Sequence, residues 1–149
     1  MYWGLCFRTI QNDEIREFVE SSEYYVGRCY EDEESTGYNI MKQLNDEGIK
    51  KVAVILMPKG NSASDLREAG IYRACEEFGM EVVAEARGLT QASDITAAAE
   101  SFLAANQDLD CIFVVATTAA GAQEAVVKAI QDAGRVGTSA PPPSISRTT

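Results

Sequence analysis

Between residues 51 and 137, short apolar runs alternate with longer stretches of helical periodicity. The runs cover residues 52–57, 81–86 and 111–116, and the helical patterns after them extend to Phe78, Ala105 and Ala133. This alternation is typical of parallel strands joined by right-handed helical crossovers. We therefore expect an α/β fold in which a ligand binds at the carboxyl ends of the strands.

The composition of the three runs predicts their places in the sheet. Residues 52–57 and 111–116 contain no charged residue, which is typical of strands buried on both faces. Polar residues interrupt residues 81–86, which indicates an edge strand. Candidate helix caps come next in the chain; they are Ser62 or Ser64, the segment 91–94, and Thr117 with Thr118.

The part of the chain before residue 51 is harder to interpret. Asn12 and Asp13 can cap a short helix through Glu20, no apolar strand is evident before it, and residues 24–29 can form a strand. The acidic run at 31–34 suits the start of a helix that extends to Asp46.

These patterns divide the chain into three parts. Residues 1–27 form an N-terminal segment that can be a remnant of a crossover between lobes. Residues 28–137 form the α/β lobe. Residues 138–149, rich in Pro, Ser and Thr, are expected to be a disordered tail.

Charge and composition then exclude several classes of partner. The 149 residues carry a formal net charge of -10, so we expect this segment to contact neither nucleic acid nor an anionic membrane. No apolar run is long enough to span a bilayer. The four cysteines form no Cys-x-x-Cys pair, and Cys75 and Cys111 fall at core-facing positions.

The common catalytic and cofactor motifs are missing from the sequence. It contains no histidine, no phosphate-binding P-loop and no Gly-x-Gly-x-x-Gly after a strand. No carboxylate ends the runs at 52–57 and 111–116, which disfavours a phospho-acceptor domain. We therefore expect a binding protein that is not an enzyme and that needs no cofactor or metal.

Several short motifs, in order over about 100 residues, resemble one family. They are Gly37 with Leu44 and Gly48 before the strand at 51–56; Ser64-x-x-Arg67-x-x-Gly70-Ile71; Asp94 with Phe102-Leu103; the turn 107–113; and Ala120-Gly121-Ala122 with Gly134. Together they resemble the second lobe of type I periplasmic-binding-type proteins. That group includes sugar-binding subunits of ABC importers and the effector domains of LacI-type regulators.

The resemblance implies a three-layer, Rossmann-like lobe with a mostly parallel sheet, which clamps a small solute, usually a sugar, against a second lobe absent here. Arg67 matches the family arginine that reaches sugar hydroxyls, and Asn61 and Ser62 lie where cleft-lining residues occur. Ala116-Thr117 stands where the family usually has Asn-Asp, so Thr117 offers a hydroxyl in place of a carboxylate. A second departure is Pro141-Pro142-Pro143, where the family continues with another strand.

Three functions follow from this resemblance. The first is a lobe of an ABC-importer solute-binding protein, which would be periplasmic or at the cell surface and would dock on an ABC permease. The segments at 106–110 and 134–137 and the acidic charge favour it. The second is the effector domain of a cytoplasmic LacI-type regulator, favoured by the four cysteines and by the lack of a signal-peptide pattern. The third is an incomplete lobe that binds nothing by itself.

Overall fold

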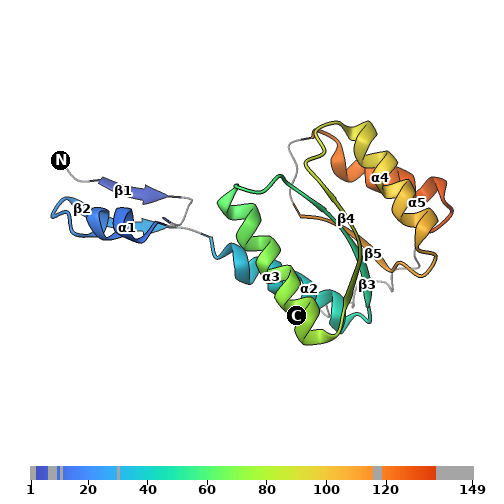
Figure 1. Cartoon of the computed structure of the whole chain (residues 1–149), viewed down its shortest axis with the longest axis horizontal. Helices are drawn as coiled ribbons and strands as arrows, with labels where there is room; N and C mark the ends of the chain where they lie inside the picture. The colour runs from blue at the N-terminus through green and yellow to red at the C-terminus, as the bar shows by residue number, and fades with distance from the viewer. Residues whose placement is uncertain (1–2, 7–9, 11, 30, 116–118, 137–149) are drawn as a thin grey trace, which may run out of the picture.

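A computed structural model describes residues 3–6, 10, 12–29, 31–115 and 119–136. Its main part is a parallel sheet of β3 (Lys51–Leu56), β4 (Glu81–Arg87) and β5 (Cys111–Val114), in the order β4-β3-β5. Figure 1 shows helices on both sides of this sheet. The three-layer α/β architecture expected from the sequence is therefore confirmed, with β4 at one edge of the described sheet. Strand β5 forms the other edge and is only half-buried, so the expectation of burial on both faces holds for β3 and not for β5.

Four helices form the two outer layers. The helices α2 (Glu33–Asp46) and α3 (Ser62–Phe78) cover one face, and α4 (Ala92–Ala105) and α5 (Ala122–Asp132) cover the other. Each described strand-to-strand connection contains a helix, as parallel pairing requires. None of the described helices has the length and apolar character needed to cross a bilayer.

The central strand β3 contributes side chains to both halves of the core. Alternate residues of a strand point to opposite faces of the sheet. Ala53 and Ile55 accordingly pack with α4 and α5, whereas Val52, Val54 and Leu56 pack with α2 and α3. All five are at most 1% exposed. This double burial explains why the run at 52–57 is uniformly apolar.

The helices α2 and α3 cross at two glycines. A Cβ atom added to Gly37 would lie within 3.0 Å of the Arg67 carbonyl oxygen, and one added to Gly70 would lie equally close to the Glu34 carbonyl oxygen. Only glycine leaves room for main chains at this separation. The crossing therefore brings the first turn of α2 against the first turns of α3, which carry Arg67.

The N-terminal unit lies beside the main sheet rather than in it (Figure 1). Its strand β1 (Trp3–Cys6) pairs in parallel with β2 (Tyr25–Cys29), and α1 (Asp13–Glu20) connects them, capped by Asn12 as expected. Strand β1 was not expected from the sequence, although it belongs to this two-stranded sheet and not to the main one. The run at 3–6 has only four residues, too few for a periodicity to be recognised.

The helix starts differ from the predictions at two places. Asn61, and neither Ser62 nor Ser64, caps α3, because its side-chain oxygen accepts a hydrogen bond from the Ser64 N–H at 3.1 Å. Gly121, in the left-handed conformation, begins α5. Thr117 and Thr118, expected to cap that helix, lie outside the described residues.

Asp110 ties the start of β5 to the start of β3. One of its carboxylate oxygens accepts hydrogen bonds from the main-chain N–H groups of Lys50 and Lys51, both at 2.9 Å. These two bonds lower the pKa of the Asp110 carboxyl group. We expect Asp110→Ala to cost about 1 kcal/mol of unfolding free energy, a value kept small by the exposure of the carboxylate. Urea denaturation would measure the loss, and Asp132→Ala at the end of α5 would serve as an exposed control.

Candidate functional site

The carboxyl edge of the sheet carries an arginine–carboxylate pair. Arg67 extends from α3 to Glu33 in the first turn of α2, and its Nε donates to the Glu33 Oε2 at 2.9 Å. The Nη2 atom of Arg67 donates to the same oxygen. The Nη1 atom lies 3.4 Å from the carbonyl oxygen of Val115, which follows the last residue of β5. The pair therefore joins two helices to the end of a strand.

The side chains of the pair are mostly buried, but part of each remains exposed to solvent. The side chain of Arg67 is 24% exposed and that of Glu33 is 13% exposed. The Nε and Nη2 atoms of Arg67 both donate to Oε2, and no described residue donates a hydrogen bond to the Glu33 Oε1. The arrangement thus presents a charged donor and a carboxylate acceptor side by side.

The other expected site residues differ in what they can offer. Asn61 and Ser62 are both half-buried at the amino end of α3, two turns or less from Arg67. Asn61 uses its side-chain oxygen for the helix cap, so its amide N–H groups remain its donors toward a ligand. Thr117 lies outside the described residues. The structure therefore places Arg67, Asn61 and Ser62 on one end of one helix.

Asp65 holds the loop that leads into this end of α3. Its Oδ2 accepts a hydrogen bond from the Gly60 N–H at 2.9 Å. Its Oδ1 is buried and has no hydrogen-bond partner among the described residues. An unpartnered buried carboxylate oxygen is costly, so a water molecule or another donor is needed there. The loop thus has one carboxylate oxygen for which the described residues supply no donor.

A second charged cluster lies at the end of β4. Arg87 donates to both carboxylate oxygens of Glu68, at 2.9 and 3.0 Å, and to Glu85 at 2.7 Å. It also donates to the Met57 carbonyl oxygen at 3.2 Å. Glu68 is only 5% exposed, and the hydrogen bonds from Arg87 lower its pKa. This cluster fastens α3 to the sheet.

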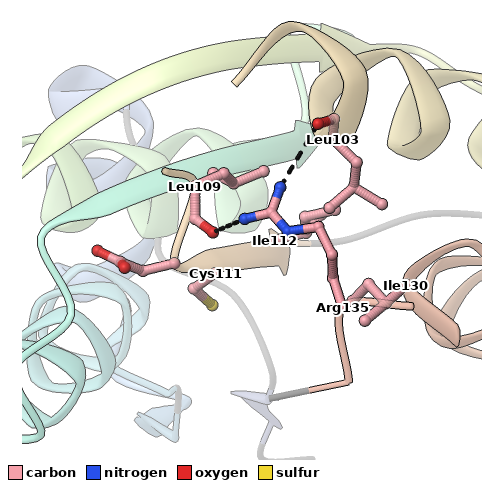
Figure 2. Close-up of a pocket in the computed structure, with 7 residues that line it drawn as sticks. Leu103, Leu109, Cys111, Ile112, Ile130 and Arg135 are labelled. Carbon is pink, nitrogen blue, oxygen red and sulfur yellow. Dashed lines mark hydrogen bonds between the residues drawn. The ribbon is translucent and has the colours of Figure 1, made fainter. Parts of the chain in front are cut away.

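A cavity lies at the opposite edge, around the start of β5. It has a volume of about 230 Å³, and the residues lining it are Leu103, Leu109, Asp110, Cys111, Ile112, Ile130 and Arg135. Figure 2 shows the Arg135 guanidinium pointing at the main-chain oxygens of Leu103 and Leu109. Those bonds, with one to Asn106, tie Arg135 to the end of α4 and to the turn before β5. We assign this cavity a structural role, because ligands of such sheets bind at the carboxyl edge.

Within the described residues, no group of three or more Cys, Asp or Glu side chains could hold a metal ion. Cys29, Cys75 and Cys111 are free thiols, and burial raises the pKa of Cys75 and of Cys111. Raised pKa values make both thiols poor nucleophiles. The chemistry that the described site supports is therefore hydrogen bonding.

Two site features escaped the sequence analysis. Glu33 was interpreted only as part of an acidic helix start, and its pairing with Arg67 depends on the crossing of α2 and α3. The cluster of Glu68 and Arg87 joins residues 19 apart on different elements. The only available signal was that Arg67 stands in the first turns of a helix, where a cation is unfavourable unless it has a partner.

The geometry defines an α/β lobe with an arginine–carboxylate pair at the carboxyl edge of a parallel sheet. Comparison with solved structures shows that it has the fold of type I periplasmic sugar-binding proteins and LacI-type regulators. No protein-family model matches the chain, and no curated protein matches it in sequence.

Three solved structures illustrate the similarity. A periplasmic sugar-binding protein from Pseudomonas fluorescens matches at a TM-score of 0.69 and 16% identity, over 89% of this chain and 39% of its own. A LacI family transcriptional regulator from Silicibacter pomeroyi matches at a TM-score of 0.62 and 20% identity, over 89% of this chain and 53% of the regulator. An ABC transporter solute-binding protein from Actinobacillus succinogenes with bound D-allose matches at a TM-score of 0.65 and 22% identity, over 87% of this chain and 44% of the solute-binding protein.

The similarity extends over most of this chain but only part of each neighbour. The chain spans 39 to 53% of the length of these three proteins. All three are binding proteins or regulators, and none is an enzyme by its description. The fold of one lobe of such proteins is thus established, whereas binding by this chain is a matter for proposal.

Proposed function

We propose that this chain is one lobe of a solute-binding protein of an ABC importer and that the solute is a sugar. The observation that carries the proposal is Arg67, held by Glu33 at the carboxyl edge of the sheet and partly exposed there. A planar guanidinium with several N–H groups suits vicinal hydroxyl oxygens. Asn61, Ser62 and Thr117 are the further proposed contacts.

A regulator is the second candidate function. The similarity to a LacI family regulator over 53% of that protein supports an effector domain as well as an importer lobe. Both functions use the same kind of sugar site, and they differ in what is attached to the lobe. A helix-turn-helix domain upstream would support the regulator, and a signal peptide or lipid-anchor motif would support the importer. The third candidate is an incomplete lobe without affinity of its own.

The proposed partners follow from the importer assignment. A second lobe would close over the sugar, and an ABC permease would receive the complex outside the cytoplasm. The regulator would instead be cytoplasmic. We further propose that residues 1–27 belong to the crossover toward the second lobe and that residues 138–149 are a tail outside the lobe. The net charge of -10 argues against direct contact with nucleic acid by this segment.

The proposal predicts that sugars stabilise the chain through Arg67. A ligand that binds only the folded state at ten times its Kd adds about 1.4 kcal/mol of unfolding free energy. We expect D-allose or another pentose or hexose, at concentrations suited to the weak affinity of half a site, to raise Tm. Arg67→Ala should abolish that increase. Differential scanning fluorimetry over a sugar panel would measure both effects.

Arg73→Ala provides the matched control. It removes the same charge from the same helix, but Arg73 pairs with Glu34 and is 53% exposed. Its sugar response should equal that of the wild type. An unchanged Tm with every sugar would refute the sugar assignment, and a response that persists in Arg67→Ala would refute the assignment of Arg67.

A further inference from the structure

The hydrogen bonds of the Glu33–Arg67 pair bear on which sugars the proposed site accepts. Two of the three donor groups of Arg67 are used on a single oxygen of Glu33. The third, Nη1, makes only a long contact of 3.4 Å to a main-chain carbonyl, which a ligand can replace. The second Glu33 oxygen, Oε1, accepts nothing from the described residues. The N–H groups of Nη1, the second N–H group of Nη2 and the acceptor Oε1 therefore remain for a ligand.

A hydroxyl group suits this combination and a carboxylate does not. A hydroxyl oxygen can accept from Nη1, and another hydroxyl of the same ligand can donate to Oε1, so a neutral diol offers a partner to each group. A carboxylate or phosphate can only accept at neutral pH. It would leave Oε1 without a donor and would lie beside the negative charge of Glu33, which repels it.

The other Lys and Arg side chains near this edge also form ion pairs with carboxylates. Each of the described Lys and Arg side chains on the loop before α3, on α3 and on β4 has an acidic partner within 3.1 Å. The pairs are Lys59 with Glu68, Arg67 with Glu33, Arg73 with Glu34, and Arg87 with Glu68 and Glu85. An anionic ligand would thus have to displace a partly buried carboxylate to gain a cation. That exchange is unfavourable.

We infer that Glu33 determines specificity at the proposed sugar site, because it makes the Glu33–Arg67 pair select a neutral diol over a ligand that carries a carboxylate. The inference rests on the proposed function. Glu33 supplies the acceptor for one sugar hydroxyl and, by neutralising Arg67, excludes sugar acids.

The test uses pairs of ring sugars in which the second member carries a carboxylate in place of the C6 hydroxymethyl group. Wild-type chain is titrated with D-galactose and D-galacturonate, and with D-glucose and D-glucuronate, while two-dimensional NMR follows the main-chain amides and the Arg67 Nε–Hε group. We expect shifts with the neutral members and none with the acids. Glu33→Gln should lose about tenfold or more in neutral-sugar affinity, the effect of one charged hydrogen bond, and should gain a response to the acids.

Glu34→Gln is the matched control, since it removes an equal charge one residue away from a carboxylate that pairs with Arg73. Its affinities should match those of the wild type. Wild-type preference for the acids, or Glu33→Gln affinities within twofold of wild type, would overturn the inference and leave sugar binding intact. No wild-type response to any of the four compounds would overturn the proposed function itself, and the inference with it. The wild-type preference needs no variant, so the test stands even if Glu33→Gln does not fold.

Discussion

Gly70→Ala is expected to destabilise the folded chain by about 3 kcal/mol, the largest effect of any single substitution proposed for this protein. A Cβ at this position would lie within 3.0 Å of the Glu34 carbonyl oxygen and of the Tyr38 main-chain nitrogen. Both obstacles are main chain, so no change of side-chain rotamer can relieve the clash. The helices α2 and α3 would have to separate, which outweighs the gain of about 1 kcal/mol in helix propensity from alanine.

Chemical denaturation followed by far-UV circular dichroism would measure this loss. Ala69→Ser is a suitable control, because it adds one heavy atom at the exposed neighbouring position of the same helix. Its cost should stay within about 0.5 kcal/mol. Gly37→Ala should behave like Gly70→Ala, because its Cβ would meet the Arg67 carbonyl oxygen. Wild-type stability in both glycine variants would mean that the two helices do not approach as closely as described.

Glu68→Gln is expected to cost about 2 kcal/mol at neutral pH. The substitution leaves Arg87 without its bidentate partner at the end of β4, where Arg87 is only 27% exposed. Removing one member of a fully buried ion pair costs roughly 3–5 kcal/mol. Arg87 keeps Glu85 and some solvent contact, which reduces the loss. Glu76→Gln, an exposed position on the same helix, should change stability by less than about 0.5 kcal/mol.

The effect of Glu68→Gln should also depend on pH. Hydrogen bonds from Arg87 hold the pKa of Glu68 below its ordinary value of 4.5 in the folded state. A lowered folded-state pKa gives stability that is fully present above the unfolded-state pKa and is lost as pH falls through the folded-state pKa. The difference between wild type and variant should therefore be constant above about pH 5 and shrink below it. A difference that grew toward acid pH would contradict the assigned partners.

The alternation of strands and helices was predictable because it depends on local periodicity. Buried strands such as β3 have no charged residue in their interior, and helix stripes repeat at fixed spacing. Strand β1 escaped prediction because four residues carry too little pattern. Two nearby serines were preferred to Asn61 as the helix cap, because Asn and Ser are both suitable residue types at that position. Such choices depend on where the helix starts, which a sequence defines only to within a few residues.

The candidate site was predictable only in part. Arg67 could be singled out from its position at a helix start, with support from the family resemblance. Its partner Glu33 lies 34 residues earlier, and nothing local distinguishes it from the other acidic residues of the run at 31–34. The choice among four carboxylates is made by the crossing of α2 and α3, a tertiary contact. For the same reason, the pairing of Glu68 with Arg87 could not be deduced from the sequence.

The glycine crossing of α2 and α3 has a consequence for the thermodynamics of ligand binding. The main chains of both helices meet beside Glu33 and Arg67, so the two side chains are held on a rigid base before any ligand arrives. Their hydrogen bonds to each other further restrict their rotamers. The conformational entropy of these long side chains is lost when the chain folds and not when a ligand binds. A ligand at this edge therefore meets a preorganised donor and acceptor. The entropy that opposes its binding is then mainly the freedom that the ligand itself loses.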